Sequence, residues 1–412
     1  MSGPAPADSG ASNAVALRRG IDVVTSTQKV TRQMGPLHGV RVVEIASLAP
    51  APFGCMILAD MGADVIRVDR ADGRAGAGIT TPSGPLDRGR RSIAVNLKDH
   101  AGVEVVRTLI ETADVFVEGF RPGVAERLGI GPIELLAINP ALVYGRMTGW
   151  GQDGPLAARA GHDINYIALA GALEPIGRAG ERPHAPMNLI GDFGGGGLML
   201  ALGIVSALFE RQRSGRGQVV DAAMVDGAAL LTSFMHGMHA SGMWEGERGT
   251  NTLDGAAPFY DTYETSDGKF MAVGCVEPQF YAQLLAALGL TESDLTSQSD
   301  TAAWPEMKAR IAEVFKKNTR AHWTEVFAGS DACVTPVLSP WEAHEHPHNT
   351  AREAFIEVDG LVQPAPAPRF DRTPNAAPVP MDDGGRDVTS TLTNWGLEES
   401  TVAALTSSGA VC

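Results

Sequence analysis

The chain has 412 residues, of which 44% are hydrophobic and 20% are charged, and its formal net charge is −15. This length is enough for one large domain and a smaller one, and the composition is typical of a soluble protein with a sizeable core. Such an excess of acidic groups disfavours general binding to nucleic acid or to anionic membranes. A local cluster of Arg and Lys could still bind an anionic ligand.

Strands and helices alternate in the first half of the chain. Apolar, β-branched runs predict buried strands, and apolar residues with helical spacing predict helices. In chain order we expect a strand at 40–45, a helix at 53–61, a strand at 64–68, a helix at 101–111, and strands at 115–117 and 142–147. This alternation favours a parallel α/β sheet. No GxGxxG motif follows the first strand, so NAD binding is not expected.

Four glycines, Gly194 to Gly197, open an apolar segment that ends near Arg211. Glycine there can allow a helix to pack closely against its neighbours, or it can allow a ligand to approach a helix N-terminus. The glycines alone favour the packing interpretation. The longest apolar run, 198–209, is shorter than the roughly 18 residues that span a bilayer, so we expect no membrane insertion.

The pattern changes near residue 250. Two apolar runs that flank Asp267 and Gly268 predict a β-hairpin, and helices are expected at 278–288, 304–315 and 322–327. We therefore expect a large α/β domain at 36–250, a small α+β domain at 251–339 and a C-terminal return to the large domain at 340–412. The last part includes an extended, proline-rich stretch at 363–380.

Both the N-terminus and the cysteines favour a cytoplasmic protein. The segment 1–35 is rich in small and polar residues and lacks an apolar core, so we expect a disordered tail and no secretory signal. Four cysteines lie far apart without zinc-type spacing, which is typical of free thiols. They are Cys55, Cys275, Cys333 and Cys412.

Other histidines do not predict a metal site. His344, His346 and His348 lack regular spacing and are interrupted by a proline, so we expect a solvated loop. His236 and His239 lie in a Met-rich helical stretch, where packing or an acyl-binding wall is the better interpretation.

Three short stretches carry side chains capable of acid–base chemistry, and each also has an ordinary structural explanation. His162 can be a partly buried histidine whose hydrogen bonds are satisfied, and Asp163 can be a helix N-cap. Asp192 can cap the glycine-rich helix, and Glu277-Pro278 is typical of a helix start. From spacing alone, catalysis is the weaker interpretation at each position.

Longer motifs change this weighing. They are VRVVEIASLAPAPFGCMILADMGADVIRVDR, VEGFRPGVAERLGIG, RMTGWGQDGP, AGHDINYIALAG, NLIGDFGGGG, GQVVDAAMVDG, LDGAAPFYDTYETSDGKFMAVG, EPQFY and SDACVTPVL. Through them the chain from about residue 35 to 370 resembles the class III CoA-transferase superfamily, and within it the α-methylacyl-CoA racemases. That resemblance implies a Rossmann-like large domain and interconversion of (2R)- and (2S)-2-methylacyl-CoA thioesters by proton transfer through an enolate.

The resemblance also implies roles for single residues. His162 and Asp192 match the two catalytic bases, and Glu277 matches a glutamate that pairs with the histidine. Asn188 matches an asparagine beside these groups, and Asp163 matches the position whose backbone N–H meets the thioester oxygen. Such a pair of bases suits racemisation, because one group removes the α-proton and the other returns a proton to the opposite face.

The expected partners are the acyl-CoA substrate and a second copy of the chain. Four positions match CoA-binding residues: Arg70, Lys98, Arg121 and Arg127. Tyr166 is a further candidate for substrate binding. No metal or separate organic cofactor is implied, because CoA arrives as part of the substrate. The resemblance implies an interlocked homodimer that combines the large domain of one chain with the small domain of the other.

Two other functions stay open. The first is a class III CoA-transferase that resembles formyl-CoA transferase. In such enzymes a nucleophilic aspartate matches the position of Asp163. A non-catalytic acyl-CoA binder is the second. The set His162, Asp192 and Glu277 favours the racemase over both.

Overall fold

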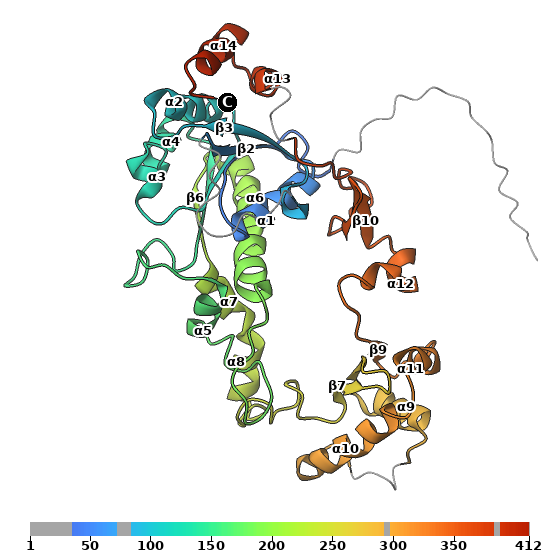
Figure 1. The fold of residues 1–412 in the computed structure, drawn as a ribbon. Helices are drawn as coiled ribbons and strands as arrows, with labels where there is room; N and C mark the ends of the chain where they lie inside the picture. Colours follow the sequence, from blue (N-terminus) through green and yellow to red (C-terminus); the bar gives the residue numbers. More distant parts are fainter. Residues whose placement is uncertain (1–34, 72–83, 292–296, 383–387, 412) are drawn as a thin grey trace, which may run out of the picture. The chain divides into compact units, whose positions relative to one another are not determined.

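The structure is a computed structural model that describes residues 35–71, 84–291, 297–382 and 388–411 (Figure 1). The expected N-terminal tail lies outside these ranges apart from Gly35, and so does Cys412. The other three cysteines are free, with Cys55 and Cys275 buried and Cys333 exposed.

Six parallel strands form the main sheet, in the order β3-β2-β1-β4-β5-β6. They are β1 (Arg41–Ile45), β2 (Asp64–Arg70), β3 (Arg90–Val95), β4 (Val115–Glu118), β5 (Val143–Thr148) and β6 (Val219–Ala223). The predicted parallel α/β sheet is confirmed, although the sequence patterns indicated neither β3 nor β6. In sheets with this order, ligands bind beyond the carboxyl ends of the strands where the order reverses, here between β1 and β4.

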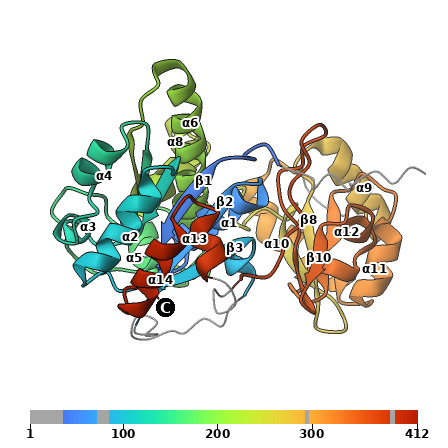
Figure 2. The same cartoon turned by 90° about the horizontal axis from the view of Figure 1, so that it is seen from above.

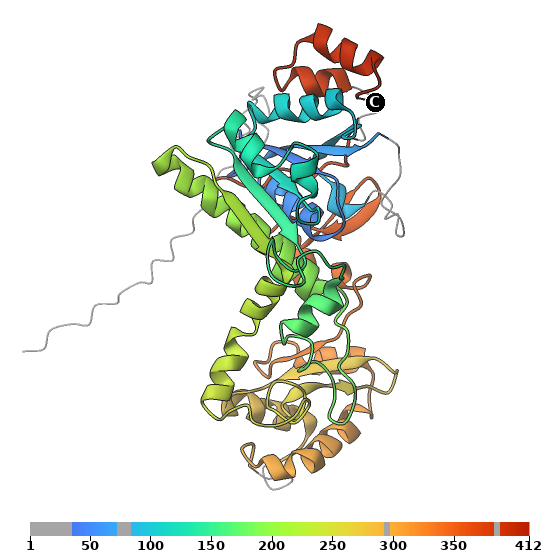
Figure 3. The same cartoon turned by 90° about the vertical axis from the view of Figure 1, so that its left-hand side faces the viewer.

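Helices cover both faces of this sheet. They are α1 (Pro50–Asp60), α2 (His100–Ile110), α3 (Val124–Arg127), α4 (Pro132–Ile138), α5 (Asp163–Leu169), the π-helix η2 (Leu189–Gly197), α6 (Leu198–Ser214) and α7 (Met224–Leu231), with a 3-10 turn η1 (Pro85–Asp87). Helix α8 (Ser233–Ala240) follows α7 and extends away from the sheet (Figure 1). Successive strand residues point to opposite faces, so Val42 enters the core with α1 and α6 while Val43 enters the core with α2 and α4. Figure 3 shows the sheet between α2, in cyan, and α1, in blue.

The C-terminal residues pack into the core on the α2 side. Helices α13 (Val388–Thr393) and α14 (Glu399–Ser407) lie over the same strands as α2 (Figure 2). Between them, the buried Trp395 donates its indole N–H to the Asp64 carboxylate at 2.9 Å. Asp382 exchanges main-chain hydrogen bonds of 2.8 and 3.0 Å with Ser92 and Arg90, which covers the open edge of β3.

A second core forms around a small antiparallel sheet. Its strands, in the order β7-β8-β9, are β7 (Tyr260–Glu264), β8 (Phe270–Gly274) and β9 (Val334–Pro336). Helices α9 (Pro278–Leu288), α10 (Trp304–Phe315) and α11 (Arg320–Phe327) complete this core, together with the 3-10 turn η3 (Thr301–Ala303). The expected hairpin and its three helices are thus confirmed, whereas β9 was not anticipated.

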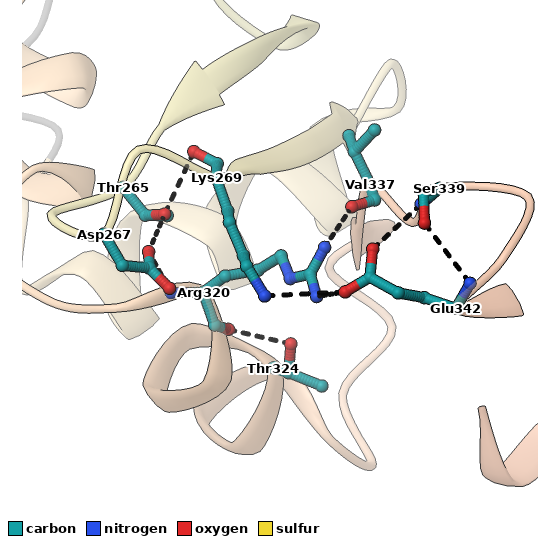
Figure 4. Close-up of polar contacts among 8 residues, drawn as sticks. All are labelled: Thr265, Asp267, Lys269, Arg320, Thr324, Val337, Ser339 and Glu342. Atoms are coloured by element: carbon teal, nitrogen blue, oxygen red, sulfur yellow. Dashed lines mark hydrogen bonds and ion pairs between the residues drawn. The ribbon is translucent and has the colours of Figure 1, made fainter. Parts of the chain in front are cut away.

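Polar contacts fix the turn of the β7–β8 hairpin to its surroundings (Figure 4). Asp267 accepts hydrogen bonds from the Thr265 hydroxyl at 2.5 Å and from the main-chain N–H of Arg320 at 3.1 Å. The Arg320 guanidinium forms an ion pair with Glu342 at 2.7 Å, and Lys269 approaches the same carboxylate at 3.4 Å. The hydrogen bond from Arg320, followed by hydrogen bonds with Ser339, holds the pKa of Glu342 well below its usual range.

The segment with three histidines is not a loop. It contains a 3-10 turn, η4 (Ala343–Glu345), and a short helix, α12 (Pro347–Ala351), which begins at the proline that was expected to break regular structure. Proline suits the first helical position, because its missing N–H would have no partner there. A two-stranded sheet of β10 (Phe355–Val358) and β11 (Leu361–Pro364) follows. Within the described residues, no group of three or more metal-ligating side chains comes together.

One continuous helical stretch, Leu189–Ser214, is long and apolar enough to cross a membrane by length and composition alone. Its second part, α6, contacts β5, β6 and α1. Only 44% of its most apolar window is buried in the single chain. A substantial apolar face therefore remains uncovered.

Candidate active site

The candidate CoA-binding residues follow the carboxyl ends of neighbouring strands. Arg70 ends β2, Lys98 follows β3, Arg121 follows β4, and Arg127 ends α3. All four side chains are exposed. Because the strands are parallel, these positions share one edge of the sheet, where ligands bind in folds of this type.

His162 and Asp163 begin α5, which follows β5 at the same edge. His162, not Asp163, is the N-cap residue, and its main-chain N–H donates to the Asn165 side chain at 3.0 Å. The His162 side chain is left exposed. The interpretation of Asp163 as an N-cap is therefore wrong, because it is the first residue inside the helix. The Asp163 carboxylate instead accepts the main-chain N–H of Asp192 at 2.7 Å.

Asp192 lies inside the π-helix η2, whose N-cap is Asn188. The Asn188 amide donates to the Asp192 carboxylate at 3.2 Å, so Asp192 is not the cap of this helix either. Burial raises the pKa of Asp192, and the negative charge of Asp163 raises it further. The hydrogen bond from Asn188 and the charge of His162 act in the opposite direction. These interactions bring His162, Asp163, Asn188 and Asp192 into one cluster, whose catalytic role stays a prediction.

The glycines of η2 serve packing at one end and the cluster at the other. A Cβ atom on Gly197 would lie 2.3 Å from the main-chain oxygen of Pro50, and one on Gly195 would lie 2.6 Å from the main-chain nitrogen of Ala228. These contacts support the packing interpretation for the end of the run. Gly191 is different, because a Cβ atom there would lie 2.5 Å from the Asp163 carboxylate.

Tyr166 lies beneath the cluster. Its hydroxyl donates to the main-chain oxygen of Gly161, and its ring meets Trp150 edge-on at a centroid distance of 4.8 Å. Burial raises its pKa to about 12, with the charge of Asp192 as the next cause. Sequence patterns alone did not single out Trp150 or Gly149, although both belong to the RMTGWGQDGP motif. A Cβ atom on Gly149 would lie 2.1 Å from the Tyr166 ring, so this glycine makes room for the ring.

Glu277 lies elsewhere in the chain. It is the exposed N-cap of α9, followed by proline at the first helical position, as the sequence predicted. No hydrogen bond or ion pair joins it to His162 among the residues that the structure describes. A hollow of about 510 Å³ lies beside β8 near Cys333, and none of the predicted catalytic residues lines it. The pairing of Glu277 with His162 therefore stays a prediction.

In chemical terms, the cluster offers two acid–base groups at the starts of two adjoining helices. His162 is exposed and Asp192 half-buried. The first N–H groups of α5 have no acceptor within the helix, and they favour negative charge nearby. Such an arrangement suits proton transfer next to a developing oxyanion.

Comparisons with known proteins identify the family of this chain. The model of "CoA-transferase family III" matches residues 37–383. An α-methylacyl-CoA racemase of Mus musculus is 52% identical over 372 residues, covering 90% of this chain and 96% of the relative. The racemase of the same name from Homo sapiens is 51% identical, covering 82% of this chain and 87% of the relative.

A solved structure has the same fold. It is a CAIB/BAIF family protein from Brucella suis, with a TM-score of 0.74 and 27% identity, covering 87% of this chain and all of that one. The chain therefore belongs to CoA-transferase family III, and within it to the relatives of the α-methylacyl-CoA racemases.

Proposed function

We propose that this chain is an α-methylacyl-CoA racemase, which interconverts the (2R) and (2S) epimers of 2-methylacyl-CoA thioesters. Relatives of that name are 52% and 51% identical to it over most of its length. The structural observation that carries the proposal is the position of His162 and Asp192. They lie at the starts of adjoining helices, at the sheet edge that also holds the candidate CoA-binding residues.

In this mechanism His162 and Asp192 exchange the roles of acid and base when the direction of the reaction is reversed. The Asp192 carboxylate accepts the α-proton from one face of the substrate, and the His162 imidazolium returns a proton to the other face. In the reverse direction, neutral His162 accepts the proton and protonated Asp192 donates. The main-chain N–H of Asp163 would stabilise the enolate oxygen between these steps. Burial favours the protonated form of Asp192, which helps it to act as the acid.

The substrate is held by its CoA part. Arg70, Lys98, Arg121 and Arg127 supply positive charge at one sheet edge of a protein whose net charge is −15. Guanidinium groups bind phosphate through paired hydrogen bonds, and they can stack on adenine. The proposal therefore needs no cofactor besides the CoA of the substrate.

The active protein in this proposal is an interlocked homodimer. Large apolar side chains on one face of α6 are spaced by one and two helical turns, and they are 51 to 62% exposed: Leu198, Leu202 and Phe209. Phe234 on α8 is 67% exposed. Several large apolar side chains this exposed are typical of a subunit interface. In such a dimer, Glu277 of one chain would orient His162 of the other.

The function is tested by proton NMR of a (2S)-2-methylacyl-CoA in D2O, without added carboxylic acid. Loss of the α-proton signal with appearance of the 2R epimer is expected. His162→Ala and Asp192→Asn should each abolish epimerisation, whereas His100→Ala, at an exposed histidine of α2, should not change it. Absence of exchange, with CoA transfer once an acceptor acid is added, would instead establish a transferase with Asp163 as the nucleophile.

The shared site is tested with a heterodimer of His162→Ala and Glu277→Ala chains that carry different tags. If Glu277 serves the partner's His162, one of the two sites in this heterodimer is intact, and about half the wild-type activity per dimer returns. If both residues act within one chain, neither site is intact and no activity returns.

A further inference from the structure

The carboxylate of Asp163 has no role in the mechanism above, which uses only its main-chain N–H. Its position is nevertheless specific. In η2 the first hydrogen bond runs from the N–H of Phe193 to the oxygen of Asn188 at 3.3 Å. The N–H of Asp192 comes before it and has no acceptor within the helix. The Asp163 carboxylate supplies that acceptor from another helix, at 2.7 Å.

The Asp163 carboxylate is buried in a space that its neighbours leave for it. Asp163 is only 7% exposed. Its second oxygen, Oδ1, is buried and has no hydrogen-bond partner among the described residues. A buried carboxylate without full hydrogen bonding destabilises a fold, so its presence calls for a reason. Gly191 leaves the space that the carboxylate occupies, because a Cβ atom there would lie 2.5 Å from Oδ2 and 2.9 Å from Cγ.

We infer that the Asp163 carboxylate is a positioning residue for Asp192: it fixes the main chain of Asp192 and thereby sets where the Asp192 carboxylate meets the substrate. This inference rests on the proposed racemase function. The contact acts on the catalytic base Asp192 through the main-chain N–H of that residue. Misplacement of a catalytic group by about 1 Å can lower a rate a hundredfold.

The inference predicts an asymmetry between the two faces of the substrate. Asp163 touches the Asp192 side of the site, whereas His162 is held by the start of α5 and by Asn165. Loss of the carboxylate should therefore slow proton removal by Asp192 more than proton removal by His162. A nucleophilic role would give no such asymmetry. It would also need an accessible oxygen, whereas Oδ1 is buried and Oδ2 accepts a hydrogen bond.

The test measures α-proton exchange in D2O from each pure epimer at early times, before the epimers mix. Asp192→Asn first identifies the epimer whose proton Asp192 removes, because only exchange from that epimer should disappear. Asp163→Ala should then slow exchange from the same epimer by about tenfold to a hundredfold. Exchange from the other epimer should change less than about threefold, and KM should be nearly unchanged.

Two further variants guard against a general folding defect. Burial is the main cause of the raised pKa of Asp192, and the Asp163 charge adds to it. Asp163→Asn keeps an oxygen acceptor but removes that charge, so the pH limb for that epimer should move to lower pH. Gly191→Ala keeps Asp163 but pushes on its carboxylate, and it should reproduce the asymmetry. Each variant is compared by thermal melting with the wild-type protein.

The outcomes separate the inference from the proposed function. Equal losses for both epimers, or unchanged rates in Asp163→Ala, would overturn the positioning role while wild-type exchange still upheld the racemase. A wild-type protein that exchanges neither epimer would overturn the racemase function, and the positioning role would fall with it.

Discussion

Substituting Gly197 by alanine should separate two helices that now touch backbone to backbone. The added Cβ atom would lie 2.3 Å from the main-chain oxygen of Pro50 and 2.9 Å from the Phe53 ring, where ordinary contacts are 3.4–4 Å. A flexible side chain could turn away, but the oxygen of Pro50 belongs to α1, in which nearly every residue is buried. The structure must therefore shift α1 or η2.

The size of the effect follows from two opposing terms. Overpacking of a well-packed interior costs about 1–3 kcal/mol, and a backbone contact this short belongs at the upper end. Alanine regains about 1 kcal/mol over glycine inside a helix. We expect a net loss of about 2 kcal/mol, which for a protein of this size lowers Tm by roughly 2–3 °C.

Gly194→Ala is the matched control in the same run of glycines. Its nearest atoms would be the main-chain oxygen of Leu189 at 3.2 Å and the Leu231 side chain at 3.3 Å, which need only small adjustments. Equilibrium unfolding in urea, followed by circular dichroism, gives both free energies. If Gly197→Ala is as stable as Gly194→Ala, close backbone packing is not the reason for glycine at 197.

Three other predictions concern charged groups. Burial raises the pKa of Asp192, so this side chain becomes protonated at a higher pH than an ordinary aspartate. As pH is lowered, the rate in the direction that uses Asp192 as the base should therefore begin to fall at a higher pH. Stopped exchange assays across a pH range measure this rate. The pKa of Glu342 is lowered in the folded state, so its pairing with Arg320 stabilises the protein above the carboxyl's unfolded pKa, and this contribution is lost as pH falls through the folded pKa. Glu342→Gln should therefore lower Tm at pH 7 and have little effect in strong acid. Arg90→Met leaves the fully buried Glu44 unpaired and should cost about 3–5 kcal/mol in urea unfolding, most of which a second substitution, Glu44→Leu, should restore.

Local sequence patterns predicted the strands that are apolar along most of their length. Strands β1, β2, β4 and β5 are apolar runs, and their alternate burial on two faces follows from the strand period. Strand β3 was missed because it begins with two arginines, and arginine rarely enters a core. Arg90 can be buried there because Glu44, 46 residues away in sequence, pairs with it at 2.5 Å. Strand β6 is a short edge strand of which most residues stay partly exposed.

The site shows the same limit. The residue types at 162, 192 and 277 became informative only through the motifs around them, because each also has a structural explanation. The bond that joins Asp163 to Asp192 spans 29 residues and connects a side chain with a main-chain N–H, so no spacing rule could reveal it. The predicted N-caps Asp163 and Asp192 were both wrong, because residue type alone favours aspartate at an N-cap. In the fold, the Asp163 carboxylate contacts the main chain of Asp192, and the Asp192 carboxylate contacts Asn188.

The C-terminal cover of the main sheet has a consequence for biosynthesis. The indole of Trp395 reaches Asp64 across 331 residues, and the main chain that covers the edge of β3 comes from Asp382. At about 5–20 residues per second, a ribosome needs roughly 15 to 65 seconds to make the stretch between these partners. During that time the nascent sheet exposes an unpaired strand edge and the part of one core that the C-terminal residues cover. Synthesis of this protein should therefore depend on chaperones that bind the nascent chain, and slower translation should lower its soluble yield when they are scarce.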